Sequence, residues 1–196
     1  DVANAFPSVC WAAVDKQIAE KARRGDAEML QQRHHSALLL VAAGDGKVVW
    51  AAPGSGTMQG DGPAAQAFAE TYDRAQEQLV ADTATLREEA SMQHLEPLSR
   101  RPVTLNRARF ADDNVQVVLH TSCQNLEARI SELDEAFRTH CGRIGLAQNT
   151  KKRQVLASFA TQGDAAEAQR LWPPAAGLRK GVVRHLGSLY EPSTTM

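Results

Sequence analysis

Apolar residues recur at spacings of three and four positions in three segments of the chain. Such a stripe lies on one face of an α-helix and is typical of a helix that packs against a core. Shorter helices are expected over 27–33, with Asp26 as the N-cap, and over 163–170. The three apolar stripes consist of Trp11, Val14, Ile18 and Ala22; of Phe68, Tyr72, Ala75 and Leu79; and of Leu126, Ile130, Leu133 and Phe137.

Other segments have the composition of strands that are separated by tight turns. Gly44-Asp45-Gly46 lies between the segments 37–43 and 47–51, and Ala111-Asp112-Asp113 lies between the segments 103–110 and 114–119. Each pair of segments is therefore expected to form a hairpin. The combination predicts an α+β fold in which a small antiparallel sheet is backed by helices on one face. The expected strands span 37–43 and 47–51, 103–110 and 114–119, 154–159, and two short segments within 179–190.

The composition is that of one globular domain. The chain has 196 residues, of which 43% are hydrophobic and 23% charged. A net charge of -1 argues against a protein that coats nucleic acid non-specifically, although it leaves a local basic surface open. No apolar run reaches the ~18–20 residues that a bilayer requires, so no membrane partner is expected. The 3 cysteines form no Cys-x-x-Cys pair and favour free thiols in an intracellular, reducing location.

Two acidic positions carry the candidate chemistry. Asp1 opens a short apolar segment, and Asp112-Asp113 lies at the centre of the second expected hairpin. Adjacent carboxylates repel each other, and a divalent cation such as Mg²⁺, which takes oxygen ligands, would offset that repulsion. The alternative that the residues alone leave open is an ordinary turn in which aspartate is well tolerated.

Five short motifs occur in a fixed order along the chain. This series resembles motifs A to E of the reverse transcriptase palm, and its last two motifs are most similar to those of non-LTR retrotransposons and group II introns. The resemblance implies a palm domain over residues 1–190, followed by a tail over 191–196. The motifs are Asp1-x-x-x-Ala5-Phe6, Gln59-Gly60-Asp61, Phe110-Ala111-Asp112-Asp113, Gly145-Leu-x-x-Asn149-x-x-Lys152 and His185-Leu186-Gly187.

The resemblance implies an RNA-directed DNA polymerase that adds deoxynucleotides to a primer 3′ end. Its partners would be an RNA template, a DNA primer and deoxynucleoside triphosphates. Asp1 and Asp112 would hold two Mg²⁺ ions, with Mn²⁺ as an alternative metal, and Asp113 would be the second carboxylate of the turn. The backbone carbonyl of Val2 would complete a metal shell.

The resemblance also assigns residues to the nucleotide and to the primer. Phe6 would lie under the sugar and exclude a 2′-hydroxyl, Gln59 and Gly60 would lie near the nucleotide and template, and Lys152 near the triphosphate. Each has a plainer alternative: a core aromatic for Phe6, a loop or capping residue for Gln59, and a solvated charge for Lys152. The primer grip would be formed by His185, Leu186 and Gly187.

Several departures from the family pattern favour a second hypothesis. An extra Gly62 precedes Pro63 after the second motif, and Arg153 stands where threonine is common. The chain would then be a degenerate or truncated retroelement copy that folds and at most binds nucleic acid. The basic fingers and helical thumb of the family have no counterpart in the chain, so the isolated chain is expected to be inactive. An RNA-copying polymerase is disfavoured by Phe6, and the sequence defines no oligomeric state.

The histidines show no metal-ligand spacing among themselves. His34 and His35 are adjacent, and His94, His120 and His140 are widely separated. They are interpreted as surface or helix-end residues.

Overall fold

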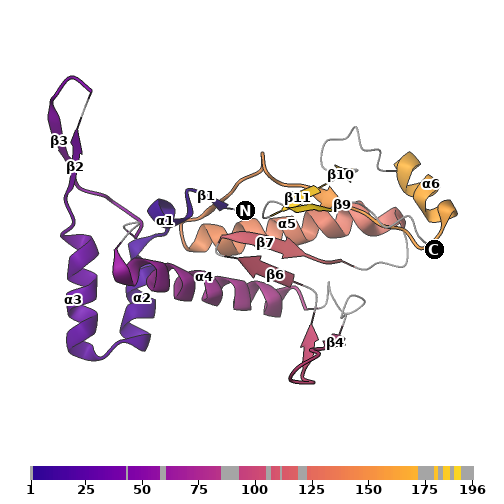
Figure 1. Ribbon diagram of the computed structural model, residues 1–196, viewed down its shortest axis with the longest axis horizontal. Coiled ribbons are helices and arrows are strands. Elements are labelled where there is room, and N and C mark those ends of the chain that lie inside the picture. The colour runs from indigo at the N-terminus through magenta and orange to yellow at the C-terminus, as the bar shows by residue number, and fades with distance from the viewer. Residues whose placement is uncertain are drawn as a thin grey trace. The chain divides into compact units, whose positions relative to one another are not determined.

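The computed structural model describes residues 2–42, 44–57, 61–84, 93–104, 107–110, 112–118, 123–171, 179–180, 183–185 and 188–190. Within these residues helices and short strands are mixed, which confirms the α+β class (Figure 1). The helices are α1 (Ala5–Ser8), α2 (Trp11–Lys21), α3 (Arg24–His35), α4 (Gly62–Asp82), α5 (Leu126–Arg143) and α6 (Gln162–Leu171), with a 3-10 turn at Cys123–Asn125. The strands are β1 (Val2–Ala3), β2 (Leu39–Ala42), β3 (Val48–Ala51), β4 (Gln93–Leu95), β5 (Pro102–Thr104), β6 (Arg107–Phe110), β7 (Asp113–Gln116), β8 (Ala147–Gln148), β9 (Val155–Leu156), β10 (Arg179–Lys180), β11 (Val183–His185) and β12 (Ser188–Tyr190).

The chain divides into two compact units. The helical unit comprises Val2–Asp82 and Ala136–Gln148, and the hairpin unit comprises Thr83–Glu135 and Asn149–Met196. The expectation of a single palm domain over 1–190 stays a prediction, and the expected tail over 191–196 lies outside the described residues.

The core of the helical unit is built from the predicted helix faces. Helix α2 packs against α3 and α4. Burying one large apolar side chain stabilises a fold by about 1.5–3 kcal/mol, so these faces account for much of the stability of the unit. The buried core residues include Val9, Val14 and Ile18, then Phe68, Tyr72, Ala75 and Leu79 of α4, and Phe137 and Cys141 of α5.

Helix α3 begins earlier than the sequence predicts. Its first residue is Arg24, so Asp26 lies in the first turn and is not the N-cap. A carboxylate in this position still interacts favourably with the partial positive charge at the start of the helix.

The first predicted hairpin is present, but the helices that the structure describes leave its large apolar side chains exposed. Strands β2 and β3 pair antiparallel, from Leu39 opposite Ala51 to Ala42 opposite Val48. Figure 1 shows this hairpin projecting away from the end of α3. Its large apolar side chains are exposed, namely Leu38, Leu39, Leu40, Val41, Val48, Val49 and Trp50.

The described strands pair in twos, and the expected single sheet is not found among them. Strands β6 and β7, β4 and β5, and β11 and β12 form antiparallel pairs, whereas β9 and β10 run parallel. The strand expected over 103–110 is divided between β5 and β6, which pair with different partners. The strand expected over 154–159 is limited to β9. In the part of the chain that the structure describes, no helix combines the length and the apolar character needed to cross a membrane.

Candidate functional site

The segment that carries the first motif leaves strand β1 and turns at once into α1. Val2 is buried and lies opposite Gln148 in β8, and Ala3 lies opposite Ala147. Asn4 adopts a left-handed backbone with φ of 49°, a conformation that asparagine tolerates better than most residues. This turn directs the chain into α1, which contains Phe6. Asp1 lies outside the described residues, so its predicted approach to Asp112 stays a prediction.

The glycine of the fourth motif fixes how α5 leads into β8. Leu146 N–H donates to the Cys141 carbonyl at 2.9 Å and Gly145 N–H to the Gly142 carbonyl at 3.0 Å, the bonding pattern of a Schellman cap. Gly145 has a φ of +80°, and a Cβ there would lie 2.8 Å from the Ser8 carbonyl oxygen. Only glycine fits both demands, so this residue lets Leu146 enter the core and β8 pair with β1.

Backbone hydrogen bonds join Gly56 and Thr57, which precede the second motif, to the segment of the first motif. Thr57 N–H donates to the Phe6 carbonyl at 2.8 Å, and Gly56 N–H donates to the Val9 carbonyl at 2.7 Å. The indole N–H of Trp11 donates to the Gly56 carbonyl at 2.9 Å. A Cβ on Gly56 would lie 2.5 Å from Pro7 backbone atoms. The two segments are therefore held in close backbone contact.

Phe6 lies at the edge of the core of the helical unit. Its ring stacks on Phe68, with centroids 4.6 Å apart, and Phe68 stacks in turn on Tyr72 at 5.7 Å. The Phe6 side chain remains half-buried. This packing supports the core interpretation and leaves part of the ring accessible, so the role under a nucleotide sugar stays a prediction.

The second motif is only partly described. Gln59 and Gly60 lie outside the described residues, whereas Asp61 forms an ion pair with Arg33 of α3. The pair borders a pocket of about 180 Å³ between α2, α3 and α4. A second ion pair borders the same pocket, with Lys21 Nζ 3.5 Å from a Glu70 carboxylate oxygen.

In the hairpin unit, the adjacent aspartates lie at the tip of a hairpin as expected. Phe110 of β6 lies opposite Asp113 of β7, so Asp112 belongs to the connecting turn and Asp113 is the first residue of the strand. Both side chains are partly exposed. Two carboxylates at one accessible turn are suitable oxygen donors for a hard divalent cation.

Lys152 ends a tight turn in the same unit. Its backbone N–H donates to the Asn149 carbonyl at 3.1 Å. Asn149 and Lys152 of the fourth motif are therefore the first and last residues of one turn. Arg153, which departs from the family pattern, lies 2.5 Å from a carboxylate oxygen of Asp134 on α5. This ion pair anchors the segment next to Lys152.

The fifth motif lies at a hairpin. Strands β11 and β12 pair antiparallel, with His185 opposite Ser188. Leu186 and Gly187 lie between these positions and outside the described residues. The expected pair of short strands is confirmed, while the primer grip stays a prediction.

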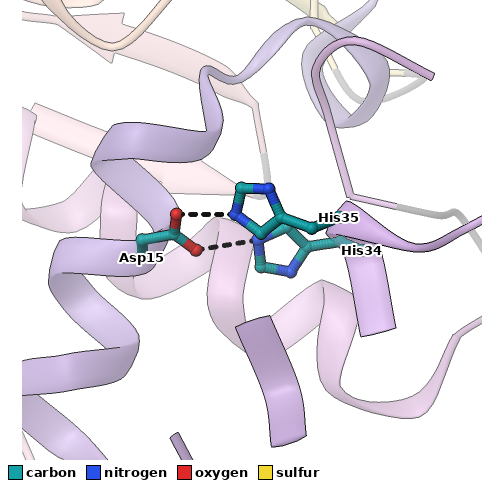
Figure 2. A group of neighbouring side chains, drawn as sticks. All are labelled: Asp15, His34 and His35. Atoms are coloured by element: carbon teal, nitrogen blue, oxygen red, sulfur yellow. Dashed lines mark hydrogen bonds and ion pairs between the residues drawn. The ribbon is translucent and has the colours of Figure 1, made fainter. Parts of the chain in front are cut away.

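The interpretation of the histidines as surface or helix-end residues is confirmed for His34 and His35 of α3 and for His140 of α5, which lie in the last turns of their helices. His140 is buried, and its Nε2 lies 3.1 Å from a carboxylate oxygen of Asp82. His34 and His35 each contact a carboxylate oxygen of Asp15 on α2 (Figure 2). Asp15 precedes them by 19 and 20 residues, so no local spacing in the sequence identifies this cluster.

Comparison with known proteins identifies no family for this chain. No family model matches it, and neither a curated protein nor a solved structure does. The likeness to reverse transcriptases therefore depends on the sequence motifs alone.

Proposed function

We propose that this chain is the palm of an RNA-directed DNA polymerase, which adds deoxynucleotides to a primer 3′ end. The observation that carries the proposal is the hairpin of β6 and β7, with Asp112 in its turn and Asp113 at the start of β7. A polymerase of this class needs carboxylates that are accessible at one point and held by a rigid element. The partly exposed aspartates meet that requirement.

The order of the elements supports the same proposal. Strand β1 is followed by helices, the β6–β7 hairpin, helix α5 and strand β8, and β8 pairs antiparallel with β1. The elements of a split βαβ arrangement follow the same order along the chain. The β2–β3 and β4–β5 hairpins are insertions within that order.

Each residue has a defined task in this proposal. Asp1 and Asp112 would hold two Mg²⁺ ions, which when bound activate the primer 3′-hydroxyl and stabilise the leaving pyrophosphate. Phe6 would restrict the space beside the sugar, and the backbone contacts of Gly56 and Thr57 would hold its segment in position. Lys152 would offer a positive charge to the triphosphate.

A degenerate retroelement copy is the second candidate. The observation that favours it is the extra Gly62, which begins α4 where the family pattern continues with Pro-Leu-Ser. Such a chain would keep the fold and at most bind nucleic acid. The two candidates differ in whether the Asp112 carboxylate supports catalysis.

Primer extension on an RNA template tests the proposal. The assay compares the natural protein that contains this sequence with its Asp112→Asn variant, in the presence of Mg²⁺ and deoxynucleotides. Asn keeps the shape of the side chain and removes the charge, so extension should be lost while the fold is retained. Asp45→Asn is the matched control, because Asp45 lies in the turn of the β2–β3 hairpin and pairs with Lys47.

Extension by the natural protein and by Asp45→Asn, together with loss in Asp112→Asn, is the expected result. Equal extension by all three proteins would overturn the assignment of Asp112. No extension by the natural protein would favour the degenerate copy.

A further inference from the structure

Helices α2 and α3 bring a carboxylate and two imidazoles together outside the proposed polymerase site. Nε2 of His34 lies 2.9 Å from Oδ1 of Asp15, and Nε2 of His35 lies 2.8 Å from Oδ2 (Figure 2). One potential ligand atom from each of the three residues lies within 4.8 Å of the other two. Figure 2 shows both rings directed at the carboxylate. The cluster therefore gathers three donor atoms around one point.

These donors match the preferences of transition metals rather than those of Mg²⁺. Imidazole nitrogen with a carboxylate oxygen suits Zn²⁺, Ni²⁺ or Fe²⁺, whereas Mg²⁺ prefers oxygen ligands alone. Neighbouring ligands on a tetrahedral Zn²⁺ lie about 3.3 Å apart, so the observed contacts would need to open by about 0.5 Å to admit the ion.

The surroundings hold the ligands in place and leave one side open. The side chain of His34 is 12% exposed and that of Asp15 is 26% exposed, whereas His35 is 44% exposed. The ring of Trp11 lies 4.7 Å from that of His35, and the Gln31 amide donates to the Asp15 carbonyl at 3.2 Å. Three positioned protein ligands with an open side are typical of sites in which water or another small ligand completes the metal shell.

We propose that Asp15, His34 and His35 form a binding site for one divalent transition metal ion of the Zn²⁺ class. The ion would replace the hydrogens that now bridge the imidazoles and the carboxylate, and it would link α2 to α3. This site is independent of the proposed polymerase function, because none of its residues belongs to the five motifs.

Titration of the metal-free chain with Zn²⁺ by calorimetry tests the proposal. The chain should bind one ion with saturation, and His35→Gln should weaken binding by about 100-fold or more, since even loss of an outer contact costs about 10–100-fold. Asp15→Asn should weaken it as well. His35 is the safer variant for folding because its side chain is the most exposed of the three.

Two variants serve as controls. Glu28→Gln removes an exposed carboxylate from α3, and His94→Gln removes a histidine that is not one of the three proposed ligands. Both should bind Zn²⁺ as the unmodified chain does. Excess Mg²⁺ should not displace the ion, and Co²⁺ in its place should give visible bands without a thiolate charge-transfer band.

The result that would overturn the proposal is equally specific. Unchanged Zn²⁺ affinity in His35→Gln, or no saturable binding by the unmodified chain, would show that the cluster is a hydrogen-bonded link between the helices. Displacement by Mg²⁺ would contradict the assigned class of metal, and a thiolate band would place the ion on a cysteine.

Discussion

At the scale of single residues, burial controls the chemistry of Cys141. This thiol is fully buried in the core of the helical unit, and burial raises its pKa from the ordinary value of 9.0 to about 12. Because the thiolate is the reactive form, Cys141 should resist iodoacetamide in the folded chain and react after unfolding in urea. Mass spectrometry of the alkylated peptides measures this. Equal reaction of Cys141 before and after unfolding would contradict its burial.

The same shift predicts a loss of stability at alkaline pH. Above pH 9.0 the unfolded thiol loses its proton, whereas the folded thiol keeps it until about pH 12. The unfolded state then binds fewer protons, so the free energy of unfolding should fall by up to about 1.4 kcal/mol per pH unit in this window. Urea unfolding of the chain and of Cys141→Ala, compared at pH 8 to 11, measures the difference. Parallel pH profiles for the two proteins would refute the assignment.

Gly145 and Gly142 form a matched pair at the end of α5. Gly145→Ala should lower the free energy of unfolding by about 1–3 kcal/mol, because the backbone is left-handed and Cβ would meet the Ser8 carbonyl. Gly142→Ala should be neutral or stabilise by about 0.5–1 kcal/mol, because nothing lies within 4 Å of its added Cβ. Urea denaturation measures both. Equal effects would contradict the Schellman cap.

The local sequence predicts the structural position of some site residues, but it does not predict contacts between residues that are distant in the chain. The sequence predicts Asp112-Asp113 in a hairpin turn, because turn residues between two apolar segments are a local signal, and the structure has Asp112 in that turn and Asp113 at the start of β7. The contact of Asp15 with His34 has no such signal. It depends on the packing of α2 against α3, which the order of residues along the chain does not show.

At the scale of elements, helix α4 provides the clearest test of the predicted periodicity. Leu79 is completely buried, whereas its neighbour Val80 is 37% exposed. Leu79→Ala should therefore cost about 2–5 kcal/mol of unfolding free energy, and Val80→Ala should change it by about 0.5 kcal/mol or less. Thermal and urea unfolding of both variants measure this contrast. A larger cost at Val80 would place the wrong face of α4 in the core.

The long helices were predicted more accurately than the sheets for a physical reason. A stripe repeated over several turns, as in α2 and α4, identifies both the helix and its buried face. Strands of two to four residues carry little periodicity, and their partners are distant in sequence. The pairing of β1 with β8 and of β9 with β10 illustrates this. The alternation of apolar and polar residues alone therefore does not predict which strands pair with one another.

At the scale of the whole molecule, a substitution of Phe6 distinguishes a role of this residue in core packing from a role in nucleotide selectivity. In the natural protein, Phe6→Ala should increase the use of ribonucleotides, because removal of the ring opens space for a 2′-hydroxyl. Phe68→Leu is the control, since it disturbs the same ring stack within the core. It should lower stability without changing nucleotide selectivity. Incorporation of ribonucleotides and deoxynucleotides in competition measures the effect, and unchanged selectivity in Phe6→Ala would assign Phe6 to the core alone.

The central claim is that Asp1 and Asp112 share a two-metal site. An experimental structure of the natural protein with Mg²⁺, a primer–template and a non-hydrolysable deoxynucleotide measures this directly. The account predicts two ions about 3.5–4 Å apart, each bound by carboxylate oxygens of Asp1 or Asp112 and by the triphosphate. Metal and nucleotide bound away from Asp112, or an Asp1 carboxylate too far from Asp112 to bind the same pair of ions, would contradict it.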